Sequence, residues 1–156
     1  MSLPVEDVRD YPHPPALEPA GARVRVLLGG ETAAESARAL RVLETHHAPT
    51  YYLPPEDVAA ELVPCPGLTF CEWKGRAEYF DVIAGGRRAR RAAWRYPAPS
   101  PRFRALAGFL AFYAGEMDLC EVGGVRVLPQ PGDFYGGWVT PNLVGTVKGG
   151  PGTEGW

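Results

Sequence analysis

The segment from Thr69 to Gly75 carries several chemically versatile side chains. It contains the thiol of Cys71, the carboxylate of Glu72 and one of the chain's two lysines, Lys74. Alternate residues of a strand share a face, so Cys71 and Lys74 point to opposite sides. An ammonium group beside a glycine could hold an anionic or carbonyl group at the mouth of a pocket. Residue type alone favours a surface lysine, and Cys71 is expected to be a small buried side chain because no adjacent base would activate it.

A second candidate group lies in the stretch Glu44-Thr45-His46-His47, which offers a carboxylate and two imidazoles. Histidine changes charge near neutral pH, so this stretch could hold a general base or two metal ligands. Adjacent histidines on a strand face opposite sides, however, and the three cysteines form no C-x-x-C pair. We therefore expect no metal site and two solvated loop histidines. Glu44 is the better candidate, because a carboxylate at a strand end can pair with a cation across a cleft.

Arginine dominates the basic residues, and residues 74–104 contain nine basic side chains against two acidic ones. Such an excess of positive charge could steer an anion or bind nucleic acid. Arg87, Arg88, Arg90 and Arg91 nevertheless occupy both faces of one predicted strand, so they cannot all line a single groove. A solvated, charged edge strand explains them better.

Aromatic side chains occur at the end of that strand and again near the C-terminus. Trp94 and Tyr96 share a face of the strand, where they could stack on a planar ligand or belong to the core. The segment Phe134-Tyr135-Gly136-Gly137-Trp138 is either a lid over a pocket or a strap packed on the core. We favour the strap and keep Trp138 as a candidate ligand contact.

The composition limits the class of protein. The chain has 156 residues, of which 46% are hydrophobic and 22% charged, as in one soluble globular domain. No apolar run approaches the roughly 20 residues that span a bilayer, and the N-terminus lacks the order of a secretory signal. The missing apolar span argues against a membrane partner. Because three cysteines are an odd number and no export signal is seen, we expect reduced thiols and a cytoplasmic protein. The net charge of −2 gives no global attraction to nucleic acid.

Three Gly-Gly pairs between strand-like runs predict two-residue hairpins at 29–30, 85–86 and 123–124. The expected strands cover residues 23–28, 31–36, 38–45, 50–53, 68–73, 78–83, 87–96, 109–113, 119–122 and 125–128. Helix is confined to a piece that starts after Ser100 with Pro101 and stops at Gly108, and to a second piece over 55–62. This pattern predicts a mainly β domain, either a sandwich or an open barrel.

The expected organisation has three parts. Residues 1–20 form an extended proline-rich arm, residues 21–128 the β core domain, and residues 129–156 an irregular strap rich in glycine and aromatics that packs on the core.

Several motifs together resemble a bacterial family known as domain of unknown function 427. They are Arg-Val-Leu-Glu-Thr (41–45), Tyr-Tyr-Leu-Pro (51–54), Cys-Glu-Trp-Lys-Gly (71–75) with Tyr79, Ala-Ala-Trp-Arg-Tyr-Pro (92–97) and Ala-Phe-Tyr (111–113). The resemblance implies a β-tent, in which two antiparallel sheets lean together as in methionine sulfoxide reductase B and related zinc-binding modules. The chain lacks the paired cysteines of those relatives, so zinc and reductase chemistry do not carry over. The family is sometimes labelled nucleotidyltransferase, but the chain shows no carboxylate cluster that would hold Mg²⁺.

The family's recurrent positions suggest a site. They fall on Glu44, Tyr52, Cys71, Lys74, Gly75, Tyr79, Trp94, Tyr96 and Tyr113. The leading hypothesis is a small-molecule site in a cleft between two sheets, without a cofactor, in which Lys74 holds an anionic group and Glu44 exchanges a proton. The candidate ligand-binding residues are Tyr52, Cys71, Tyr79, Trp94, Tyr96 and Trp138.

Two other hypotheses remain open. The chain could be a non-enzymatic interaction module that uses the arginine-rich hairpin 87–95 to bind nucleic acid or an acidic partner. It could also be a scaffold without a ligand, which a buried Glu44–Lys74 ion pair under the C-terminal strap would support.

Overall fold

The computed structural model describes residues 3–71, 74–132, 135–150 and 152–153. Its regular structure is mainly β, with antiparallel sheets and a few short 3₁₀ helices, which confirms the predicted fold class. Glu72, Trp73 and Phe134, which the sequence singled out, lie outside the described residues. None of the described helices is long and apolar enough to cross a membrane.

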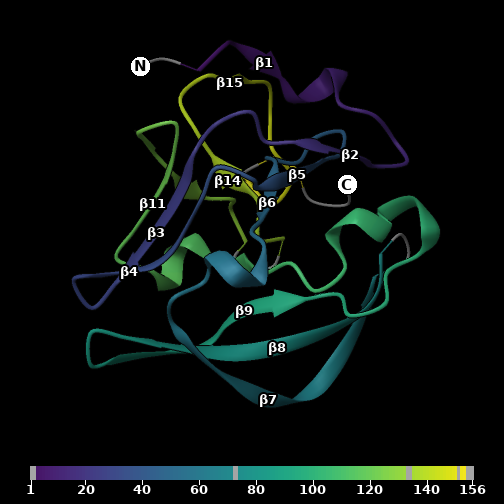
Figure 1. The fold of residues 1–156 in the computed structure, drawn as a ribbon. Helices are drawn as coiled ribbons and strands as arrows, with labels where there is room; N and C mark the ends of the chain where they lie inside the picture. The colour runs from purple at the N-terminus through teal and green to yellow at the C-terminus, as the bar shows by residue number, and fades with distance from the viewer. Residues whose placement is uncertain (1–2, 72–73, 133–134, 151, 154–156) are drawn as a thin grey trace.

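The longest strands form a four-stranded antiparallel sheet, called here the β8 sheet, in the order β10-β9-β8-β7. Its members are β7 (Glu61–Cys71), β8 (Gly75–Ala84), β9 (Arg87–Arg95) and β10 (Ala111–Phe112). In Figure 1, β7, β8 and β9 run together along one side of the molecule, and the other sheets lie opposite them. The prediction for residues 68–73 found only the end of β7, which starts at Glu61 and includes the last two residues of the segment expected to be helical.

A second four-stranded sheet, the β3 sheet, has the order β12-β11-β3-β4. It contains β3 (Val24–Leu28), β4 (Glu31–Ser36), β11 (Leu119–Val122) and β12 (Val125–Arg126). Val24, Val26 and Leu28 are buried and the residues between them are half-buried, as the alternation along this strand predicted.

The third sheet, the β5 sheet, has the order β2-β5-β6 and contains β2 (Ala16–Pro19), β5 (Leu40–Leu43) and β6 (Thr50–Tyr52). Two short pairs complete the structure: β1 (Glu6–Asp7) runs parallel to β15 (Leu143–Val144), and β13 (Leu128–Pro129) pairs with β14 (Trp138–Val139). The described strands therefore form three larger sheets and two pairs, where the resemblance implied two sheets. A Leu53–Leu110 bridge connects the end of β6 to the start of β10 and so joins the β5 sheet to the β8 sheet.

All three Gly-Gly pairs form the predicted hairpin turns, and each of the six glycines has a positive φ. The turns at Gly29-Gly30 and Gly85-Gly86 also touch. A Cβ on Gly29 or on Gly85 would overlap the backbone of the other turn. Glycine is therefore required here both by the backbone angle and by the close approach of two sheets.

The helices are shorter than the sequence predicted. The piece after Ser100 is a 3₁₀ helix, η3 (Pro101–Leu106), with a kink at Phe103, and the piece over 55–62 shortens to η2 (Pro55–Asp57). The other two helices among the described residues are η1 (Val8–Asp10) and η4 (Ala114–Glu116). Proline starts η2 and η3 as expected, but each run is too short to bury an amphipathic face as an α-helix would.

The C-terminal segment lies against the core through Trp138. This indole is 1% exposed, its Nε1 donates to the Phe112 carbonyl at 2.9 Å, and its ring centroid lies 5.3 Å from that of Tyr51. The Trp138 backbone N–H donates to the Pro49 carbonyl at 2.8 Å. The segment is thus held in place beside the loop that connects β5 and β6.

Candidate functional site

A cavity of about 240 Å³ is bounded by strands of the β5 sheet and the β8 sheet. Its lining comprises Val42, Glu44, His47, Ala48, Thr50, Tyr52, Thr69, Cys71, Lys74, Tyr79, Trp94, Tyr96, Tyr113 and Tyr135. Sites for drug-sized ligands enclose roughly 300–1,000 Å³, so this volume suits a smaller molecule.

The structure brings seven of the eight candidate residues together in this lining. They are Glu44, Tyr52, Cys71, Lys74, Tyr79, Trp94 and Tyr96. The eighth, Trp138, is not among the lining residues, because its indole turns into the core.

Strand register explains why the aromatic walls converge. Tyr79 of β8 is directly paired with Trp94 of β9, so both side chains emerge on the same face, and Tyr96 follows on that face two residues later. Tyr52 packs onto them from β6, with ring centroids 6.5 Å from Trp94 and 6.3 Å from Tyr96. Tyr113 adds a close contact with Trp94 at 4.5 Å.

Three phenols of this cavity, those of Tyr52, Tyr96 and Tyr113, stay protonated at any physiological pH. Burial raises the pKa of Tyr52 and Tyr96 well above the usual value, and it raises the pKa of Tyr113 to about 12. Each phenol can therefore donate as well as accept a hydrogen bond in the cavity.

Lys74 lies at the turn between β7 and β8, just before Gly75, whose φ of 98° requires glycine. Its Nζ is 5.8 Å from the ring centroids of both Tyr96 and Phe103, within the range of a cation–π contact. Among the described residues, no carboxylate lies within ion-pair distance of Lys74. Within the described parts of the chain, the contacts of its ammonium group are therefore the faces of these two rings.

Glu44 follows β5 directly and is flanked by two imidazoles. Its Oε2 lies 3.5 Å from Nδ1 of His13, and its Oε1 lies 4.0 Å from Nε2 of His47. Glu44 also lines a second, more open hollow of about 500 Å³, together with His13, Thr45, His46, His47 and Lys148. Its carboxylate therefore stands where the cavity meets this hollow, and Glu44 and Lys74 form no ion pair with each other.

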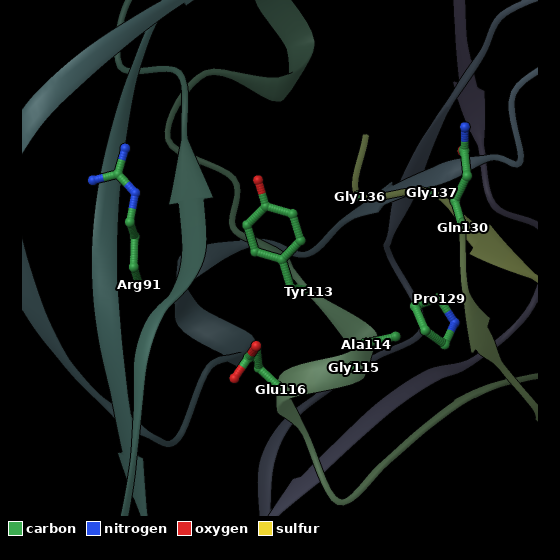
Figure 2. A pocket seen from close by; sticks show the side chains of 9 residues that line it. All are labelled: Arg91, Tyr113, Ala114, Gly115, Glu116, Pro129, Gln130, Gly136 and Gly137. Atoms are coloured by element: carbon green, nitrogen blue, oxygen red, sulfur yellow. The ribbon is translucent and has the colours of Figure 1, made fainter. Parts of the chain in front are cut away.

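Another cavity, of about 210 Å³, shares Tyr113 with the first. Figure 2 shows the Tyr113 ring between the strand that carries Arg91 and the segment that carries Gly136 and Gly137. The Arg91 guanidinium carbon lies 4.0 Å from the ring centroid of Tyr79, so this cation stacks on a ring that lines the first cavity.

The arginines of β9 are largely compensated by nearby acids. Arg87 pairs with Asp118 at 3.1 Å, Arg95 with Glu78 at 2.9 Å, and Arg88 with Asp81 at 2.8 Å. Arg90 lies 3.9 Å from Asp81. Strand β10 pairs with Ala93 and Trp94, so the arginine-rich first half of β9 lies at an edge of the sheet.

Sequence reasoning underrated three residues of the lining: His47, Tyr113 and Tyr135. His47 was expected to be solvated, but its side chain is 19% exposed, and its ring centroid lies 5.2 Å from that of Tyr135 in an edge-on contact. Tyr113 was visible only as a recurrent family position. Tyr135 belongs to the aromatic-glycine segment, but the spacing of that segment does not reveal which of its side chains faces the cavity.

The described residues include no group of three or more His, Cys, Asp or Glu side chains arranged to hold a metal ion. A scan against family models matches residues 16–123 to a domain of unknown function, DUF427. The chain belongs to this DUF427 family. No curated protein matches it. The DUF427 match includes every candidate residue from Glu44 to Tyr113 and ends before Tyr135 and Lys148, which contribute to the same region.

Proposed function

We propose that this DUF427 domain binds a small molecule with an anionic group in the 240 Å³ cavity, where Lys74 contacts the anion and Glu44 exchanges a proton with the ligand. The observation that carries the proposal is the position of Lys74: an ammonium group lines an aromatic cavity and has no carboxylate partner among the described residues. A core needs no such lysine, whereas apolar walls with a few convergent polar groups are the usual form of a ligand site.

The other polar groups of the lining support an anionic ligand. The phenols supply neutral hydrogen-bond donors, and Lys148, which lies 5.3 Å from the Tyr135 ring centroid, adds a second positive charge in the adjoining 500 Å³ hollow. Glu44 is the acidic side chain among the described lining residues, so it is the natural partner for a hydroxyl or amine elsewhere on the ligand.

A thermal-shift screen of small carboxylates, phosphates and nucleotides tests this proposal, because a ligand that binds only the folded state raises the apparent stability. The variant Lys74→Met keeps the aliphatic stem against Tyr96 and Phe103 but removes the charge. We expect any anion-induced shift of the wild type to be lost in Lys74→Met. The matched control is Arg126→Ala, which removes one exposed positive charge on β12, outside the cavity lining. Equal shifts in wild type and Lys74→Met would refute the role of Lys74.

The alternative function, binding of nucleic acid or an acidic partner by the hairpin 87–95, stays a prediction. We favour the cavity because four of the five arginines in β9 have a carboxylate within 4.0 Å, which weakens the field that a polyanion would meet. Binding to a nucleic acid that weakens steeply with added salt, and that Lys74→Met leaves unchanged, would favour the alternative.

We also propose a cytoplasmic location. Cys65, Cys71 and Cys120 are all free thiols, as is usual in a reducing compartment. Fractionation of cells that express the full chain would test this location.

A further inference from the structure

Gln130 has a side-chain amide whose orientation is fixed by two backbone groups of opposite kind. Its Oε1 accepts from the Ala48 N–H at 3.2 Å, and its Nε2 donates to the Lys148 carbonyl at 3.0 Å. Exchanging the oxygen and nitrogen would place acceptor against acceptor and donor against donor. Gln130 is 2% exposed, so losing either partner would leave a buried polar group without its hydrogen bond.

The same Nε2 lies 3.3 Å from Nδ1 of His47. Since one hydrogen of this amide goes to the Lys148 carbonyl, the other faces the imidazole, and Nδ1 must accept it through its lone pair. The ring proton of a neutral His47 then sits on Nε2. Protonating Nδ1 as well would set two N–H donors against each other.

Burial and the nearby cations favour the same neutral state of His47. Burial lowers its pKa below the usual value, and the cations Lys148 and Lys74, together with His46, lower it further, while Glu44 opposes them. His47 is therefore neutral near pH 7.

His47 and Glu44 both line the cavity, and Nε2 is the ring nitrogen of His47 on the Glu44 side. Its distance of 4.0 Å to Oε1 of Glu44 is too long for a hydrogen bond, and no described residue accepts a hydrogen bond from Nε2. We propose that His47 is a neutral hydrogen-bond donor to the anionic group bound in the cavity, and that Gln130 is the positioning residue that fixes its proton on Nε2. The ligand contact rests on the proposed function of the cavity, whereas the tautomer does not.

This arrangement narrows the chemistry of the ligand. Lys74 supplies a full positive charge, and His47 supplies a donor that is oriented before the ligand arrives and does not compete with Glu44 for a proton. Preorganised donors of this kind stabilise an oxygen anion without reorganising. The expected ligand group is thus an oxyanion, such as a carboxylate or phosphate, held between Lys74 and His47.

Long-range ¹H–¹⁵N NMR of the full chain, labelled at histidine nitrogens, reads the tautomer without any ligand. The chain has three histidines, so the variants His13→Gln and His46→Gln assign the remaining signals. At pH 7 we expect a neutral His47 with its proton on Nε2. In Gln130→Met, which keeps the length but removes both hydrogen-bonding ends, the preference for Nε2 should disappear.

The outcomes are distinct. An imidazolium at pH 7, or a proton on Nδ1, in the wild type would overturn the proposal whether or not Gln130→Met folds. An unchanged tautomer in folded Gln130→Met would overturn the role of Gln130.

Titration with inorganic phosphate tests the ligand contact, with His47→Gln and His47→Asn as a matched pair. The longer glutamine amide reaches the place of Nε2, and the shorter asparagine amide does not. We expect about tenfold weaker phosphate binding in His47→Asn and a smaller loss in His47→Gln. If Lys74→Met weakens binding and His47→Asn does not, only the donor role of His47 fails. If the wild type does not bind phosphate, or if Lys74→Met leaves binding unchanged, the proposed anion site fails, and with it the ligand role of His47, while the tautomer result stands.

Discussion

Replacing Trp138 by phenylalanine tests whether the C-terminal segment is held to the core by one side chain. The indole is buried, and its Nε1 donates to the Phe112 carbonyl at 2.9 Å. Phenylalanine would fit within the space but leave this carbonyl without its donor, which costs about 1–3 kcal/mol. The smaller ring also leaves unfilled volume, at about 1 kcal/mol. We therefore expect Trp138→Phe to lower the free energy of unfolding by about 2–4 kcal/mol.

Urea denaturation followed by circular dichroism measures this loss, provided that the unfolding transition is two-state. In a thermal melt the same loss corresponds to a decrease in Tm of about 6–12 °C for a chain of this size. Leu128→Ala is the matched control, because Leu128 lies on the partner strand β13 and is 59% exposed. A loss below about 1 kcal/mol in Trp138→Phe, or an equal loss in Leu128→Ala, would refute the reasoning.

Two further predictions concern single ionisable groups. The Arg91 backbone N–H, the Cys65 thiol and the Arg88 guanidinium all donate to Asp81 and lower its pKa to about 2. The pKa of an aspartate in the unfolded state is near 3.9, so the stabilisation from Asp81 is fully present above about pH 4 and is lost as the pH falls toward 2. The free energy of unfolding, measured between pH 4 and 2, should therefore decrease less steeply in Asp81→Asn than in the wild type. Parallel slopes would contradict this. Burial raises the pKa of the Cys120 thiol to about 12, so a maleimide should modify Cys120 only after denaturant is added. Mass spectrometry can count the maleimide groups attached before and after denaturation. Labelling of Cys120 in the native state would show that the β3 sheet opens readily.

The sequence predicted most strands because their signals are local. Alternation in residues 24–28 and the three glycine pairs depend only on neighbouring residues and on the backbone angles that a two-residue turn demands. The long β7 was missed in part because Pro64, Pro66 and Gly67 interrupt it, and the register shift between Pro64 and Leu68 accommodates them. The predicted helix over 55–62 failed because tertiary pairing outweighs a weak local preference for helix: Val58 bridges to Ala34, and the Ala59 and Ala60 N–H groups donate to the Ala33 carbonyl.

The candidate site was predictable to the extent that it follows from strand faces and family positions. Trp94 and Tyr96 share a face by parity, and pairing places Tyr79 beside them. Trp138 was assigned to the cavity by residue type alone, whereas its indole lies in the core, where Nε1 donates to the Phe112 carbonyl. His47 was underrated because the residues that cover it, Gln130 and Tyr135, are more than 80 positions away.

Through Gln130, the C-terminal segment sets the protonation of His47 in addition to covering the core. The DUF427 match ends at residue 123, so the donor that sets the protonation of His47 lies outside the matched region, although His47 lies within it. Gln130 is held by the chain on both sides, through the Ala48 N–H beside His47 and the Lys148 carbonyl near the C-terminus. A Cβ on Gly137 would overlap both Oε1 of Gln130 and the Ala48 carbonyl, so the glycine permits this close approach. Displacing the segment would therefore change the charge balance of the cavity as well as its walls, because a His47 freed from Gln130 could accept a second proton beside Glu44.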